Sequence, residues 1–168
     1  MKAFVVIAIF IALQACSNIE SYNGIEAGNI LELKERLTIR ANSARISIQF
    51  GKIVNYSQID NYYPHCWFIS WKRKTEPQII KVDKFEIISV IETFDLVKRE
   101  SGGFRLSAIS VADSGLTAVE YITEIHLRSE KQPHIKRLIC SHWEDPSDAA
   151  HLSLQQIQNT LGNIAAIR

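Results

Sequence analysis

Short apolar segments in which every second residue is apolar run through most of the chain, with turn-forming residues between them. Residues 118–128 have the clearest pattern. Apolar and charged side chains alternate there, with Val119, Tyr121, Ile125 and Leu127 on one face and Glu120, Glu124, His126 and Arg128 on the other. Because successive side chains of an extended strand point to opposite faces, this pattern predicts a β-strand with one buried face.

Five other segments are predicted to be strands. They cover residues 45–50, 66–71, 85–97, 104–111 and 134–142. In the first of them Ile46, Ile48 and Phe50 share a face, and Gly51 then permits a tight turn. Glycine, serine and proline mark turns at 100–103, 113–115 and 130–133. Turn-linked strands of this kind predict a mainly β fold, an antiparallel β-sandwich or a small barrel-like sheet.

One short C-terminal helix is also predicted. Ser153 and Gln156 have the spacing of a capping box, and Leu152 can contact Ile157 across that cap. The apolar face of the helix consists of Leu154, Ile157 and Leu161. Gly162 follows at the position of a left-handed C-terminal cap. We expect this face to pack on the sheet.

The N-terminus has the features of an export signal. Lys2 precedes an uninterrupted apolar run over residues 3–13, which as a helix rises only about 16 Å and is too short to span a bilayer. A positive residue, a short apolar run and a small residue before Cys16 are typical of a cleaved signal peptide. An uncleaved anchor, or a secretory signal with a coincidental cysteine, is the alternative.

The segment Leu13-Gln14-Ala15-Cys16 resembles the lipobox of bacterial lipoproteins. The blocks at 44–51 and 63–66 and the end around Cys140 are similar to small lipoproteins of Gram-negative bacteria to which no activity is assigned. This resemblance implies cleavage after residue 15 and lipid on Cys16, with Ser17 favouring the outer membrane. Three acyl chains would hold such a protein far more firmly than one.

Processing of this kind leaves 153 of the 168 residues. Residues 16–29 are polar and are predicted to form the lipidated N-terminus and a flexible tether, and residues 30–168 a single β-rich periplasmic domain. Loss of Lys2 leaves 18 basic and 18 acidic side chains, a balance that favours no nucleic-acid partner. The basic residues 72–74 are interpreted as a solvated turn.

Once Cys16 carries lipid, Cys66 and Cys140 remain, and the oxidising compartment of an exported protein favours a disulfide between them. Two alternatives stay open. One is a zinc or copper site formed by these cysteines with His65 and His142, although His65 and Cys66 are adjacent and would point to opposite strand faces. The other is a pair of free buried thiols.

Aromatic residues cluster around the start of the strand predicted at 66–71. Tyr62 and Tyr63 precede it, and Trp71 ends it. Tyrosine and tryptophan bring large contact areas at low entropic cost, so these three side chains are a candidate partner surface. They can equally fill the core where the strand begins.

No motif for nucleophilic, phosphate-binding, zinc-dependent or dinucleotide-dependent catalysis occurs in the chain. The leading hypothesis is therefore a non-enzymatic lipoprotein without cofactor, anchored by lipid on the periplasmic face of the outer membrane, that binds another envelope protein. One competitor is a small-ligand or metal-binding lipoprotein that uses the neighbourhood of His65, Cys66, Cys140 and His142. Another is an envelope hydrolase with dispersed catalytic residues.

Overall fold

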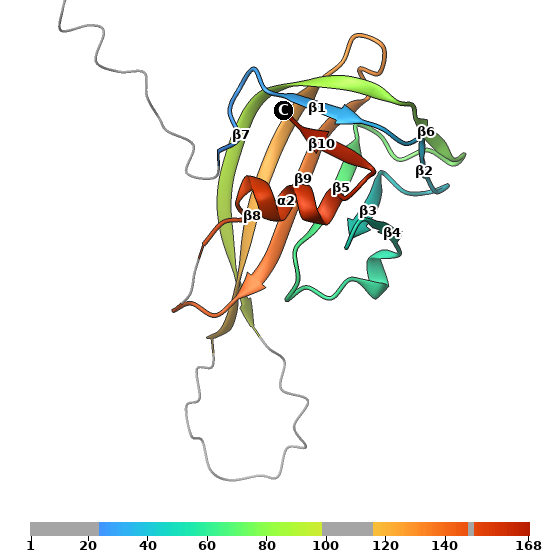
Figure 1. Ribbon diagram of the computed structural model, residues 1–168. Coiled ribbons are helices and arrows are strands. Elements are labelled where there is room, and N and C mark those ends of the chain that lie inside the picture. The colour runs from blue at the N-terminus through green and yellow to red at the C-terminus, as the bar shows by residue number, and fades with distance from the viewer. Residues whose placement is uncertain (1–23, 99–115, 148–149) are drawn as a thin grey trace, which may run out of the picture.

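A computed structural model describes residues 24–98, 116–147 and 150–168 of the chain (Figure 1). These residues form an eight-stranded antiparallel sheet, a two-stranded sheet and one α-helix. The larger sheet is curled and has two free ends, and the helix lies against its inner side. The predicted mainly β fold with a short C-terminal helix is confirmed.

The eight strands follow one another across the sheet in an order different from their order in the chain. They are β10 (Ala165–Ile167), β1 (Ile30–Leu33), β7 (Asp83–Lys98), β8 (Leu116–Arg128), β9 (Ile135–Glu144), β5 (His65–Ser70), β3 (Arg45–Gln49) and β4 (Lys52–Val54). The small sheet pairs β2 (Leu37–Ile39) with β6 (Gln78–Ile80). The remaining elements are the 3-10 helix η2 (Tyr56–Gln58) and the α-helix α2 (Leu154–Leu161).

The two faces of the large sheet differ in what covers them. We call the face toward α2 the covered face; Cys66, Phe68 and Leu138 lie on it and join one apolar core with Ile157 and Leu161 of α2. The opposite, open face carries Trp67, Ile69 and Ile139 at the alternate positions, and all three are only half-buried. The period-two pattern of the sequence therefore predicts the two faces correctly.

β8 confirms the clearest of the predicted strands. Val119, Ile125 and Leu127 are buried on the covered face, as predicted, and Tyr121 on the same face is half-buried. β8 pairs with β7 from Arg128 back to Leu116. The strand predicted at 104–111 and the turns predicted at 100–103 and 113–115 lie outside the described residues.

The predicted position of Phe50 is wrong. Ile46 and Ile48 are buried, but Phe50 is 61% exposed. Gln49 and Lys52 are paired, so Phe50 and Gly51 form the two-residue turn between β3 and β4. Both have positive φ, 53° and 69°, as a tight hairpin turn requires. The strand therefore ends at Gln49, one residue before the end that the apolar alternation predicts.

The N-terminus of α2 forms the predicted capping box. Ser153 Oγ accepts a hydrogen bond from Gln156 N at 3.3 Å, and the Gln156 side chain accepts one from Ser153 N at 2.9 Å. Gly162 ends the helix with φ 56° and ψ −129°, which is not the left-handed helical conformation predicted. Its backbone packs against Gly51, and Gly51 N donates to Thr160 O at 2.9 Å, so this departure seats α2 on the β3–β4 turn.

The folded domain begins before residue 30. Ile25 is fully buried in the core, and Gly28 N donates to Ile87 O at 2.8 Å. Residues 24–29, which the composition assigns to the tether, therefore belong to the domain. The signal peptide and Cys16 lie outside the described residues.

We expect Gly162→Ala to lower the free energy of unfolding by at least about 2 kcal/mol, because a Cβ there would lie 2.7 Å from Gly51 Cα and the backbone has positive φ. Gly28→Ala is the matched control: its φ is 96° but nothing lies within 4 Å of the added Cβ, so only about 1 kcal/mol is lost. Urea unfolding measures both losses. Equal losses would contradict the close packing of the two glycines.

Candidate functional site

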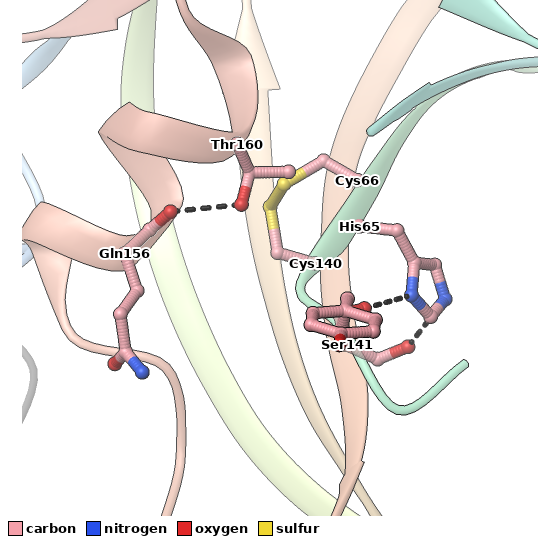
Figure 2. Close-up of a disulfide and its surroundings, with 7 residues drawn as sticks. His65, Cys66, Cys140, Ser141, Gln156 and Thr160 are labelled. Carbon is pink, nitrogen blue, oxygen red and sulfur yellow. Dashed lines mark hydrogen bonds between the residues drawn. A yellow bond between two sulfur atoms is a disulfide. The ribbon is translucent and has the colours of Figure 1, made fainter. Parts of the chain in front are cut away.

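Cys66 and Cys140 form a disulfide that joins the neighbouring strands β5 and β9 in the interior of the sheet. They are directly opposite in the strand register, their sulfur atoms are 2.10 Å apart and their Cα atoms 4.0 Å apart. Both side chains are fully buried on the covered face, and Figure 2 shows Thr160 of α2 beside the bond. The predicted pairing is confirmed.

The same bond contradicts the alternative metal site. Both sulfur atoms are bonded to each other, so neither Cys66 nor Cys140 offers a thiolate. His142 shares the covered face with Cys140, whereas His65 pairs with Ser141 on the open face. The four proposed ligands are thus divided between two sides of the sheet. Among the described residues, no three His, Cys, Asp or Glu side chains are grouped closely enough to hold a metal ion.

His65 instead lies in a buried chain of hydrogen bonds (Figure 2). Its Nδ1 is 3.0 Å from Tyr63 O, and its Nε2 is 3.1 Å from Ser141 Oγ. Ser141 Oγ also lies 2.8 Å from Glu120 Oε1. This connection links β5, β9 and β8 on the open face, and no sequence motif signalled it.

The three contacts among Tyr63 O, His65, Ser141 and Glu120 need three hydrogens, but a neutral His65 ring and the Ser141 hydroxyl supply only two. The Tyr63 carbonyl only accepts, so the neutral ring carries its hydrogen on Nδ1, and Nε2 must accept from the Ser141 hydroxyl. That hydroxyl then has no hydrogen left for Glu120. Protonating His65 would complete all three bonds, but burial opposes the charge, and the pKa of His65 is lowered despite the raising influence of Tyr63 O, Glu120 and Asp60.

Ser141 and His65 are not arranged like a catalytic serine and its base. The Ser141 side chain is fully buried, so a substrate carbonyl has no access to its oxygen. In a catalytic triad the acid contacts the histidine, whereas here the carboxylate of Glu120 contacts Ser141. The Nδ1 atom of His65 lies beside the backbone carbonyl of Tyr63 instead of a carboxylate. The arrangement is suited to holding three strands together.

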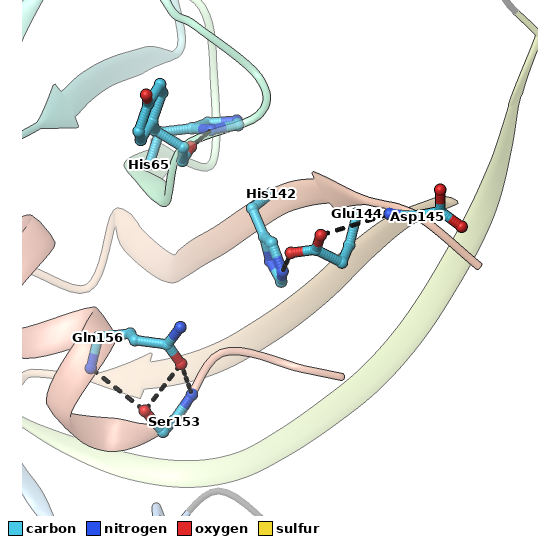
Figure 3. Close-up of polar contacts among 7 residues, drawn as sticks. His65, His142, Glu144, Asp145, Ser153 and Gln156 are labelled. Atoms are coloured by element: carbon cyan, nitrogen blue, oxygen red, sulfur yellow. Dashed lines mark hydrogen bonds and ion pairs between the residues drawn. The ribbon is translucent and has the colours of Figure 1, made fainter. Parts of the chain in front are cut away.

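His142 occupies the covered face near the end of β9. Its Nε2 lies 3.6 Å from Glu144 Oε2 (Figure 3), and its ring centroid is 6.1 Å from that of Tyr121. His151, which precedes α2, packs edge-to-face with the same tyrosine ring, with the ring centroids 5.3 Å apart. Burial lowers the pKa of His142, and the carboxylate of Glu144 only partly compensates.

The three aromatic residues predicted as a partner surface are all exposed. Tyr62 and Tyr63 are each 52% exposed, and Trp71 is 69% exposed, so they do not fill the core. The ring of Tyr62 packs edge-to-face with that of Trp143, and the ring of Tyr63 with that of Phe50. The two tyrosines precede β5 and Trp71 follows it, and a six-residue strand separates them by about 20 Å. They therefore form two separate surfaces.

Trp71 is part of a groove of about 550 Å³ on the open face. Ile69 and Ile88 also line it, and Ile88 lies at a bulge of β7 between Ile87 and Ser89. The alternation of the sequence cannot reveal such a bulge, since one inserted residue changes which side chains face outward. Sequence reasoning therefore missed this groove.

Basic side chains surround the groove. The ammonium group of Lys136 lies 5.7 Å from the centroid of the Trp71 ring. Arg137 Nη1 is 2.8 Å from Glu124 Oε1, and Arg128 Nη2 is 2.6 Å from Glu86 Oε2. The groove is thus apolar inside with charged groups at its rim, as in many protein-binding surfaces.

Comparisons of this chain with protein-family models, with curated proteins and with solved structures find no match.

We expect the Cys66→Ala/Cys140→Ala double variant to lose about 4 kcal/mol of unfolding free energy, because the bond closes a loop with a sequence separation of 74. Denaturant titration without reductant measures the loss, and the unmodified chain in reductant should lose a similar amount. A loss below about 1 kcal/mol would mean that the bond contributes little to the fold.

The pKa of His65 and that of His142 lie below the ordinary 6.5, so the unfolded chain binds more protons than the folded one just below that pH. Stability is therefore expected to fall as the pH is lowered from about 7.5 to about 5.5. Urea midpoints at the two pH values measure this change. His65→Asn and His142→Asn should each reduce it; a midpoint that rises toward pH 5.5 would contradict the assignment.

Proposed function

We propose that this chain is an exported lipoprotein whose domain binds another envelope protein through the open face of its sheet. The observation that carries the proposal is the exposed apolar surface around the groove. Trp71, Ile88 and Ile91 are 69%, 44% and 46% exposed. Exposed apolar surface of this extent beside a charged rim is typical of sites that bind proteins.

The disulfide supports the part of the proposal that concerns export. A disulfide between two strands persists in an oxidising compartment and is rare in the cytosol. Lipidation of Cys16 and attachment to the periplasmic face of the outer membrane rest on the lipobox resemblance. Among the described residues, no helix is long and apolar enough to cross a membrane.

The competing functions receive less support from the geometry. A metal-binding role loses its thiolate ligands to the disulfide. A hydrolase would need a nucleophile in contact with substrate, and Ser141, which lies beside His65, is fully buried. The open-face groove instead presents a large tryptophan, the residue type most enriched at the centres of protein interfaces.

The test is cross-linking of the full chain in intact cells. We expect Trp71→Ala to reduce the yield of the cross-linked envelope partner at least about tenfold, because loss of a central tryptophan contact costs about 2 kcal/mol or more. The variant should fold normally, since the side chain is mostly exposed.

Phe50→Ala is the matched control, because Phe50 is an aromatic residue of similar exposure, 61%, and contacts Tyr63 at the other surface. It should leave the cross-link intact. Loss of the cross-link in Phe50→Ala but not in Trp71→Ala would place the partner on the tyrosine surface and overturn the proposal. Cys16→Ala should remove the protein from the membrane fraction; its retention there would contradict the lipid anchor.

A further inference from the structure

The groove at Trp71 carries an unbalanced positive charge. No acidic side chain of a described residue lines it, whereas four side chains that are or can become cationic do: His126, Arg128, Lys136 and Arg137. The two arginines are already paired with carboxylates beside the groove. Lys136 is exposed and forms no ion pair with any described carboxylate, and its ammonium group lies 5.7 Å from the centroid of the Trp71 ring.

The loop between β5 and β6 adds three cations next to Trp71. Residues 72–74, Lys-Arg-Lys, follow the tryptophan directly, all three are exposed, and none is ion-paired with a carboxylate in the described part of the chain. Glu76 is the one acidic residue of the loop. Burial lowers the pKa of His134 and the charge of Lys74 lowers it further, so the loop cations lie beside the start of β9.

Backbone hydrogen bonds hold both ends of this basic segment. Trp71 N donates to His134 O at 2.7 Å, and Asn42 N donates to Lys74 O at 2.7 Å. The cations are therefore presented from a fixed backbone beside the groove. Less conformational entropy is lost when a ligand binds to groups that are already held in position.

The apolar part of the groove indicates that the ligand is not charged throughout. Trp71, Ile69 and Ile88 line a concave space of about 550 Å³. A projecting apolar side chain would fill this space and cover the exposed area of Trp71 and Ile88, in the manner of an anchor residue in a protein interface. The flat headgroup layer of a membrane would leave the same space unfilled.

We propose that the groove binds an acidic segment of the partner protein, in which glutamate or aspartate residues flank an apolar side chain. The apolar side chain enters the groove beside Trp71, and the carboxylates pair with Lys136 and residues 72–74. This proposal rests on the proposed function, to which it adds the chemistry of the partner. Complementary charge of this kind selects among partners and speeds their association.

The test measures binding of a fluorescent, end-blocked peptide, in which glutamates flank a central leucine on both sides, to the full chain in uncharged detergent. We expect saturable binding, seen as a rise in fluorescence anisotropy. Added sodium chloride should weaken it, because salt screens ion pairs between exposed groups. The counterpart peptide with lysine in place of glutamate should not bind, because the same cations repel it.

Lys136→Glu should weaken binding of the acidic peptide about fivefold, because it replaces an attraction between exposed charges by a repulsion. Lys136→Gln, which only removes the charge, should weaken it less. Lys52→Glu is the matched control, with the same change of charge at an exposed lysine. Lys52 lies toward the other end of β5, since it pairs with Gln49 and Gln49 with His65, so this variant should bind the peptide normally.

The proposal is overturned if the acidic peptide does not bind, if the lysine peptide binds as tightly, or if Lys136→Glu and Lys52→Glu weaken binding equally. Phosphatidylglycerol added to the detergent micelles tests the other anionic partner, a membrane surface. A change in the indole NMR signal of Trp71 on this addition, without binding of the peptide, would assign the cations to lipid headgroups and also overturns the proposal.

The outcome is separable from that of the proposed function. If Trp71→Ala removes the cellular cross-link while Lys136→Glu leaves it intact and the acidic peptide does not bind, the acidic partner is wrong and the open-face function stands. If the peptide binds through Lys136 while Trp71→Ala leaves the cellular cross-link intact, the preference of the groove for acidic segments stands and the envelope partner docks elsewhere.

Discussion

The pairing of β5 with β9 across the Cys66–Cys140 disulfide is the constraint on which the rest of the structure depends. The bond directs Cys66 and Cys140 toward α2, and strand alternation then directs His65, Trp67 and Ile69 to the other face. A shift of one residue in this register would move Phe68 out of the core and the tryptophans into it. The covalent bond between the two strands makes such a shift impossible without breaking it.

The face opposite α2 combines rigid polar connections with uncovered apolar surface. The contacts from His65 through Ser141 to Glu120 join three strands without exposing a reactive group. Around them, half-buried and exposed apolar side chains extend toward the groove at Trp71. α2 and the disulfide hold the sheet from one side and the buried contacts of His65 and Ser141 from the other, so only the part of the open face around Trp71 is left exposed for a partner.

Much of the fold was predictable from local pattern. The alternation over 118–128 and the capping box at Ser153 are short-range signals. Both elements form as predicted, because the tertiary structure buries the apolar face of the strand and the capping box satisfies the backbone at the start of the helix. The three-residue strands β2, β6 and β10 carry too few alternating positions to be recognised. The alternation predicts Phe50 in a strand because it is apolar, whereas in the structure Phe50 belongs to the exposed turn between β3 and β4.

The sequence by itself determined the strand periodicity, the helix cap and the presence of two cysteines that an oxidising compartment would pair, since these depend on neighbours in the chain and on composition. Tertiary structure decided which surfaces are available. The separation of Tyr62 and Tyr63 from Trp71 follows from the length of β5, and the groove from side chains that β5, β7, β8 and β9 bring together. Each of these results from how strands of unequal length are placed side by side, and no local pattern contains that placement.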